Sequence, residues 1–117
     1  MKKLKFVIVI PARFKSSRFP GKPLALIKGK PMIYHVWRQC IKAVNKKNVF
    51  IATDDDRIKN ACLKYSMNFQ MTSSKCKTGT DRMYDFSKKI LADLYINVQG
   101  DEPKIKPKDI IKIVKLG

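Results

Sequence analysis

The chain has 117 residues, 44% of them hydrophobic, which suits one domain with a single core and excludes a disordered chain. Its formal net charge of +17 first suggests a nucleic-acid-binding protein. The cations, however, are 21 Lys and only 5 Arg spread along every segment, whereas nucleic-acid sites favour Arg, so we interpret the charge as a solvated lysine-rich surface.

The first predicted element is a strand over Phe6–Ile10, continuously apolar and β-branched, as in a central parallel strand covered on both faces. A loop over residues 11–23 follows, in which three prolines and Gly21 exclude a regular helix. It carries four cations: Arg13, Lys15, Arg18 and Lys22. Open α/β sheets bind ligands at the carboxyl ends of their strands, so this loop suits a polyphosphate. The alternative is a solvated basic loop.

The rest of the chain alternates helices and strands. After a turn at Gly29, apolar residues at helical spacing predict a helix from Pro31 to Val44. The later elements are a strand over Val49–Thr53, a helix begun by Asp54–Asp56, a strand over Phe69–Met71, a helix opened by Gly79, a strand over Leu94–Val98 and a last helix from Lys106. This order predicts an α/β fold: a Rossmann-like three-layer sandwich with a mostly parallel sheet and right-handed crossovers.

Polar residues follow three of these strands, and a parallel sheet brings them to one edge. They are the basic loop, Asp54, and the turn that holds Gln99, Asp101 and Glu102. A basic loop facing a carboxylate is what a nucleoside triphosphate with Mg²⁺ requires, and we predict Asp101 as the metal ligand, with a plain turn aspartate as the alternative. Asp54 is either functional or a helix cap, and its position favours the cap. The Walker motif GxxxxGK[ST] and the dinucleotide-binding motif GxGxxG are both absent from the sequence, which argues against an ATPase of the Walker class and against a dinucleotide-binding site.

Histidine and cysteine are predicted to be structural. His35, the single histidine, lies beside the apolar stripe of its helix, and Cys40 and Cys62 fall on apolar helical faces. With Cys76 they make an odd number without a CxxC pair, which indicates neither a disulfide framework nor a zinc site and fits a cytoplasmic protein. The basic start is followed by an apolar run too short for a secretory leader, and no run approaches the length of a membrane span.

Five blocks of the sequence resemble the cytidylyltransferases that activate acidic sugars, most closely the 3-deoxy-manno-octulosonate (Kdo) cytidylyltransferases. The blocks stand in the right order and spacing: Ile10–Pro23, Gly29–Ile33, Ala52–Asp54, Thr78–Arg82 and Asn97–Pro103. Members of that family are considerably longer. Residues 1–117 therefore resemble only the N-terminal nucleotide-binding part of the domain, of the nucleotide-diphospho-sugar transferase type, without its C-terminal half.

The resemblance implies roles for individual residues. Arg13, Ser17, Arg18 and Lys22 match the loop that holds the triphosphate and ribose. The cytosine pocket is matched by Pro11, Ala12, Thr78, Gly79, Thr80 and Arg82. Gln99 matches a position near sugar and nucleotide, and Asp101 matches the first magnesium aspartate. We expect Arg13, Lys22 and Asp101 to be catalytic. The family's second metal aspartate belongs to the missing half, and the one later candidate, Asp109, has the position of a helix cap.

The implied reaction is transfer of CMP from CTP to Kdo, with Mg²⁺ as cofactor, for lipopolysaccharide biosynthesis in the cytoplasm. The partners implied are CTP and the acidic sugar, with neither nucleic acid nor membrane, and a homodimer for full-length relatives. Alternatives are another acidic sugar (amino-Kdo or a sialic-acid-like one), a CTP-binding fragment without turnover, and a basic nucleic-acid-binding domain. Because half of the domain is missing, we expect this chain alone to bind CTP without transferring it.

Overall fold

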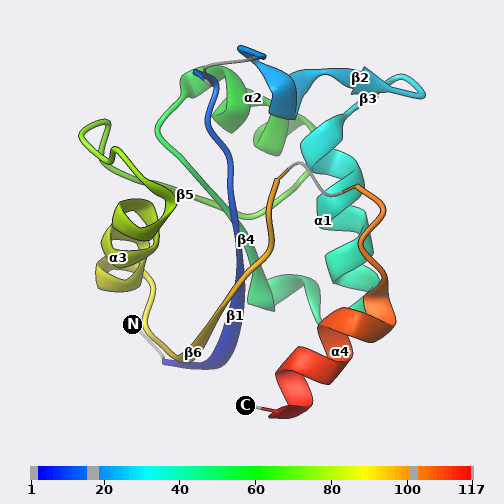
Figure 1. The fold of residues 1–117 in the computed structure, drawn as a ribbon, viewed down its shortest axis with the longest axis vertical. Helices are drawn as coiled ribbons and strands as arrows, with labels where there is room; N and C mark the ends of the chain where they lie inside the picture. Colours follow the sequence, from blue (N-terminus) through cyan, green and yellow to red (C-terminus); the bar gives the residue numbers. More distant parts are fainter. Residues whose placement is uncertain (1–2, 16–18, 101–102, 117) are drawn as a thin grey trace.

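A central sheet flanked by helices makes up the computed structural model of the chain, which describes residues 3–15, 19–100 and 103–116 (Figure 1). The four strands of the sheet are β1 (Leu4–Pro11), β4 (Val49–Thr53), β5 (Phe69–Met71) and β6 (Ala92–Asn97). The helices are α1 (Met32–Ala43), α2 (Asp56–Lys64), α3 (Gly79–Lys89) and α4 (Pro107–Leu116). Two 3-10 turns, η1 (Lys22–Leu24) and η2 (Lys46–Asn48), and a small hairpin of β2 (Leu26–Ile27) and β3 (Lys30–Pro31) complete the described elements.

The sheet has the order β5-β4-β1-β6, and every neighbouring pair is parallel. Helices α1 and α4 pack on each other on one side of it, and α3 covers the other side (Figure 1). The predicted fold class, a mostly parallel α/β sandwich, is therefore confirmed. Because β1 lies between β4 and β6, the segments that follow β1 and β6 emerge side by side.

The apolar run in β1 is continuous because both of its faces are covered. Ile8 and Ile10 are buried in the larger core cluster, together with residues of α1, α2 and α4. Val7 and Val9 face the other way and are buried with Phe86 of α3. A strand covered on both sides is expected to read as an unbroken hydrophobic run.

The element boundaries lie within two residues of the prediction from the sequence: the strands predicted over Phe6–Ile10 and Leu94–Val98 span Leu4–Pro11 and Ala92–Asn97. Val49–Thr53 and Phe69–Met71 have the predicted bounds. The interpretation of Asp54 as the cap of α2 is wrong, because the side chain of Asp55 accepts the N–H groups of Arg57 and Ile58. The hairpin β2–β3 was not predicted, since two-residue strands leave no alternation to read.

The structural roles predicted for histidine and cysteine are confirmed. His35 Nε2–H donates to the carbonyl oxygen of Ile27 at 2.7 Å, which ties the hairpin to α1. Cys40 and Cys62 are buried, and burial raises the pKa of each thiol to about 12, which leaves them unreactive at neutral pH. Within the described ranges, no helix is both long enough and apolar enough to span a membrane.

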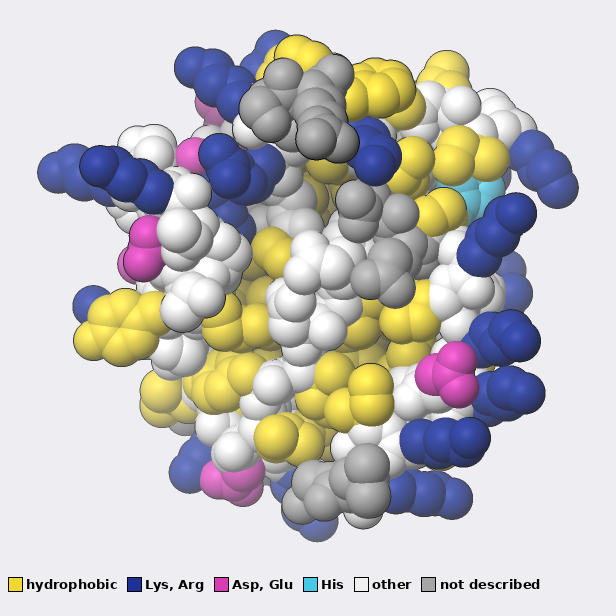
Figure 2. All heavy atoms as spheres, viewed as in Figure 1, with side chains coloured by type: hydrophobic (Ala, Val, Ile, Leu, Met, Phe, Trp, Pro, Cys, Tyr) yellow, Lys and Arg dark blue, Asp and Glu magenta, His cyan; other side chains and the backbone are white. Residues whose placement is uncertain are grey.

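On the face that Figure 2 shows, the basic side chains are spread out and do not form one patch. Lys and Arg side chains lie around the rim of this face, whereas hydrophobic side chains gather at its centre (Figure 2). This distribution fits the interpretation of the net charge as a solvated lysine-rich surface.

Candidate functional site

The loops that follow β1 and β6 meet the start of α3 at a cavity of about 340 Å³. Its lining is Pro11, Ala12, Arg13, Lys22, Pro23, Gly79, Arg82, Gln99 and Gly100. Seven residues predicted for the site come together here: Pro11, Ala12, Arg13, Lys22, Gly79, Arg82 and Gln99. Thr80 lines an adjoining cavity, and Thr78 caps α3. Ser17, Arg18 and Asp101 lie outside the described residues.

The basic loop is folded back on itself at Gly21. The N–H of Gly21 donates to the carbonyl oxygen of Phe14, and Gly21 has a left-handed backbone with φ 75°. A Cβ at this position would lie 2.9 Å from the Phe14 ring, so the turn requires glycine. The 3-10 turn that follows places Lys22 at the cavity wall, beside the buried Pro23.

A stacked arginine anchors this loop to α2. The guanidinium carbon of Arg57 lies 3.2 Å from the centroid of the Phe14 ring. The same guanidinium pairs with Asp55 at 2.7 Å, and its hydrogen bond holds the pKa of the Asp55 carboxyl below its ordinary value. Phe14 and Arg57 were not predicted to shape the site, because nothing in the sequence indicates a contact between residues so far apart.

Gly100 allows the end of β6 to approach the end of β1. A Cβ at Gly100 would lie 2.9 Å from the carbonyl oxygen of Pro11. The segment is held there by the N–H of Val98, which donates to the carbonyl oxygen of Val9 at 3.0 Å. This close approach brings Gln99 to the cavity beside Pro11.

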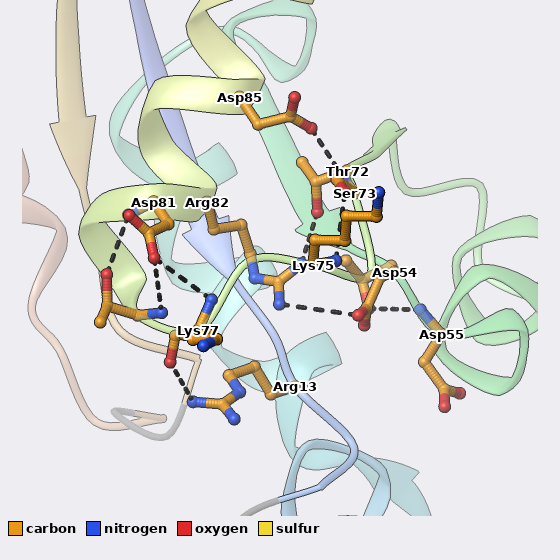
Figure 3. Close-up of polar contacts among 12 residues, drawn as sticks. Arg13, Asp54, Asp55, Thr72, Ser73, Lys75, Lys77, Asp81, Arg82 and Asp85 are labelled. Atoms are coloured by element: carbon orange, nitrogen blue, oxygen red, sulfur yellow. Dashed lines mark hydrogen bonds and ion pairs between the residues drawn. The ribbon is translucent and has the colours of Figure 1, made fainter.

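The start of α3 offers backbone donors to the cavity. Thr78 and Asp81 form a capping box: the hydroxyl of Thr78 accepts the N–H of Asp81, and the carboxylate of Asp81 accepts the N–H of Thr78 (Figure 3). Within the described part of the chain, no residue accepts the N–H groups of Gly79 and Thr80. N–H groups of this kind at a helix start suit an anion or the acceptor edge of a base.

Two arginines reach the loop that precedes α3, from opposite sides. Arg13 is exposed, and its Nη1 donates to the carbonyl oxygen of Lys77 at 3.5 Å. Arg82 is buried, and its guanidinium donates to the hydroxyl of Thr72 and lies 3.8 Å from the carboxylate of Asp54 (Figure 3). Its Nε has no hydrogen-bond partner among the described residues. Arg82 therefore supports the cavity wall largely from within the protein.

The pairing of Arg82 with Asp54 was not predicted, although the sequence holds a signal for the burial of Arg82. Arg82 lies four residues before Phe86 of α3 and eight before Ile90, the C-cap of that helix, so the spacing places all three on its inner side. A buried arginine requires an anionic or hydrogen-bonding partner. The aspartates that follow β4 were the candidate partners for the Arg82 guanidinium.

The carboxylates described at this edge of the sheet do not form a metal centre. Asp54 faces Arg82 and Asp55 faces Arg57, and the described residues contain no group of three or more His, Cys, Asp or Glu side chains that could hold a metal ion. Asp109 lies exposed in the first turn of α4. The predicted metal ligand, Asp101, lies outside the described residues, so the binding of Mg²⁺ here stays a prediction.

The chain is similar to known cytidylyltransferases. The model of the family described as "Cytidylyltransferase" matches residues 7–116. The 3-deoxy-manno-octulosonate cytidylyltransferase of Escherichia coli is 48% identical over 91% of this chain, which covers 43% of that relative. The 8-amino-3,8-dideoxy-manno-octulosonate cytidylyltransferase of Shewanella halifaxensis is 49% identical over 93% of this chain and 46% of its own length. The chain thus spans less than half of each of these relatives.

Solved structures show the same pattern of similarity. A structure of CMP:2-keto-3-deoxy-manno-octonic acid synthetase complexed with CTP has a TM-score of 0.90 and 46% identity, over 95% of this chain and 46% of that one. A cytidylyltransferase from Leptospira borgpetersenii has a TM-score of 0.82 at 22% identity, which supports the fold alone.

Proposed function

Because this chain belongs to the cytidylyltransferase family, we propose that it forms the nucleotide-binding half of an enzyme that transfers CMP from CTP to Kdo. The observation that carries the proposal is the 340 Å³ cavity, which gathers three cationic side chains, Arg13, Lys22 and Arg82, with the backbone at the start of α3. The names of the relatives support CTP and Kdo as substrates. The product, CMP-Kdo, is an activated sugar for lipopolysaccharide biosynthesis, and we place its synthesis in the cytoplasm.

The cavity residues divide into two groups by chemistry. Arg13 and Lys22, with Ser17 and Arg18 of the same loop, are proposed to bind the triphosphate and ribose, since cations form charge-assisted hydrogen bonds to phosphate oxygens. Thr78, Gly79 and Thr80, with backbone near Pro11 and Ala12, are proposed to contact the cytosine, and Gln99 is proposed to lie near the sugar and the nucleotide. Arg82 supports the wall of the cavity at the start of α3 through its contacts with Asp54 and Thr72.

The proposed reaction is a single in-line displacement. The anomeric hydroxyl oxygen of the sugar forms a bond to the α-phosphorus of CTP, and the bond from that phosphorus to the bridging oxygen breaks. Pyrophosphate leaves with the electron pair, and the hydroxyl proton passes to solvent. Arg13 and Lys22 neutralise the charge that develops on the pyrophosphate. Mg²⁺, held through Asp101, would supply further charge neutralisation on the phosphate oxygens.

A second sugar is a candidate because relatives that are named for it match equally well. The 8-amino-3,8-dideoxy-manno-octulosonate cytidylyltransferases are 47–49% identical to this chain, close to the 48% of the E. coli Kdo enzyme. The two sugars differ at C8, far from the hydroxyl that attacks phosphorus. The same assay with each sugar separates the two candidates.

Pyrophosphate release tests the proposal. This chain is co-expressed with the part of the E. coli relative that it does not match, and the pair is assayed with CTP, Mg²⁺ and Kdo. We expect Kdo-dependent release from the pair and none from the chain alone, because alignment of the sugar hydroxyl needs groups from the second half.

Asp101→Asn is the matched control, and it should abolish the release while leaving the pair assembled. If the assembled pair released no pyrophosphate with either sugar, the proposed activity would be wrong. Release that is equal with and without sugar would show hydrolysis of CTP in place of transfer.

A further inference from the structure

A further cavity, of about 300 Å³, shares Arg13 and Arg82 with the nucleotide cavity. The rest of its lining is Phe14, Lys15, Asp54, Asp55, Ser74 and Cys76, and the proposed function gives none of these a contact with nucleotide or sugar. Of the three cysteines, all within the described residues, Cys40 and Cys62 are 0% exposed, whereas Cys76 is partly exposed. This cavity therefore holds the accessible thiol of the chain.

The loop that carries Cys76 is held in place on both sides of the thiol. The N–H of Ser73 donates to the carboxylate of Asp85 at 2.8 Å, and the N–H of Lys77 donates to that of Asp81 at 3.2 Å (Figure 3). The N–H of Cys76 itself donates to the carbonyl oxygen of Ser73 at 3.2 Å. The backbone of Cys76 is thus fixed at the cavity wall, and a group attached to its sulfur would stay at this cavity.

The charges of the cavity favour an anionic occupant. Three cationic side chains and two carboxylates line it, and each carboxylate already faces an arginine. Within the described part of the chain, Arg13 and Lys15 form no ion pair, and the buried Nε of Arg82 has no hydrogen-bond partner. A buried donor without an acceptor, beside two cations without counter-ions, points to a negatively charged ligand.

We propose that Cys76 is a site of reversible modification by a small anionic disulfide, such as glutathione disulfide. The thiolate sulfur of Cys76 attacks one sulfur of the disulfide, so that a new S–S bond forms and the old one breaks. The second glutathione leaves as a thiolate and takes up the proton that Cys76 lost. Cys76 is oxidised and the departing glutathione is reduced, so the disulfide is the only reagent. Arg13 and Lys15 attract the carboxylates of this reagent.

The modification would regulate the nucleotide site, and this part of the inference rests on the proposed function. Arg13 lines both cavities, and its Nη1 donates at 3.5 Å to the carbonyl oxygen of Lys77, the residue after Cys76. An anionic group on Cys76 would compete with the triphosphate for the Arg13 guanidinium. The modified chain should therefore bind CTP more weakly, and a dithiol that releases the glutathione should restore binding.

Mass spectrometry of the native chain tests the modification. The rate at Cys76 with glutathione disulfide is compared with the rate with cystamine, a cationic disulfide, and each is divided by the rate for the same chain unfolded in urea. Lys15→Gln removes a cation from the cavity, and Lys47→Gln, on η2 and outside the cavity lining, is its matched control. Cys76→Ser removes the thiol, and melting curves confirm that each variant is folded. Titration with CTP measures the consequence.

We expect one mixed disulfide, at Cys76, that forms at least about tenfold faster with glutathione disulfide than with cystamine after this correction. Lys15→Gln should reduce the preference, and Lys47→Gln should not. Glutathione on Cys76 should weaken CTP binding by about tenfold, as the loss of a charge-assisted hydrogen bond implies. Cys76→Ser should bind CTP as the unmodified chain does, with or without the disulfide.

The proposal is overturned if native Cys76 forms no mixed disulfide, if the two disulfides react equally well, or if Lys15→Gln and Lys47→Gln behave alike. It is also overturned if the modified chain binds CTP as tightly as the unmodified one. A chain that binds no CTP before modification would contradict the proposed function instead, and the preference for the anionic disulfide would still decide whether Cys76 is a modification site.

Discussion

The guanidinium of Arg82 lies 3.8 Å from the carboxylate of Asp54, although Arg82 belongs to the first turns of α3 and Asp54 follows β4. The side chain of Arg82 is 2% exposed and that of Asp54 is 25% exposed, so the guanidinium is shielded from water while the carboxylate is partly accessible. The contact fixes the start of α3, with the backbone of Gly79, against the carboxyl end of the sheet. Arg82 is therefore a positioning residue for the cavity.

Arg82→Met should destabilise the fold, because it leaves Asp54 and the hydroxyl of Thr72 without their buried partner. We expect a loss of about 1–3 kcal/mol in the free energy of unfolding, measured with urea. Lys3→Met, which breaks the exposed ion pair with Asp93, is the control and should leave stability unchanged. If the two variants lost the same free energy of unfolding, the contact between Arg82 and Asp54 would stabilise the fold no more than the exposed ion pair of Lys3 does.

The basic loop should bind nucleotide more specifically than the general lysine surface. Arg13→Ala or Lys22→Ala should weaken CTP binding by about 1–3 kcal/mol, the scale of charge-assisted hydrogen bonds, as measured by calorimetry. Lys46→Ala and Lys47→Ala change lysines of η2, which do not line the nucleotide cavity, and should have little effect. If all four variants lost the same affinity, the loop would act only through its net charge.

Gly100→Ala should separate the ends of β1 and β6. The new Cβ would lie 2.9 Å from the carbonyl oxygen of Pro11, so the backbone must move, at a cost of about 1–3 kcal/mol. Gly79→Ala is the matched control for stability, since its Cβ would meet nothing within 4 Å. Thermal unfolding should show a lower melting temperature for Gly100→Ala but not for Gly79→Ala. An unchanged melting temperature for Gly100→Ala would contradict the close approach of Gly100 to the carbonyl oxygen of Pro11.

Asp85 should contribute to acid sensitivity. Its carboxylate accepts the N–H of Ser73 and pairs with Lys89, and these contacts hold the pKa of Asp85 below its ordinary value of 3.8. A carboxyl whose pKa is lower in the folded state stabilises the protein above its unfolded pKa, and this contribution is lost as the pH falls through the folded pKa. We expect Asp85→Asn to flatten the fall of stability below about pH 4 in urea titrations. An unchanged slope would show that the contacts of Asp85 are not maintained in solution.

The sequence predicted the fold and the place of the site because both follow from local patterns. The unbroken apolar run before Pro11 identified a central strand, and parallel strands bring their following loops to one edge, so Arg13 and Gln99 could be placed together in advance, whereas Gly79 was placed there by the resemblance to the family. The pairing of Asp54 with Arg82 could not be predicted in this way, since it depends on how α3 packs across β4. For Asp101, the predicted metal ligand, the prediction remains untested.

The change in melting temperature with CTP, compared with ATP and GTP at equal concentration and with Mg²⁺, tests the central claim most directly. A ligand that binds only the native state raises the melting temperature in proportion to its affinity. The account predicts a clearly larger rise with CTP than with either purine nucleotide. Equal rises with all three would mean that the cavity binds phosphate without reading the base, and would contradict a cytidine-specific site.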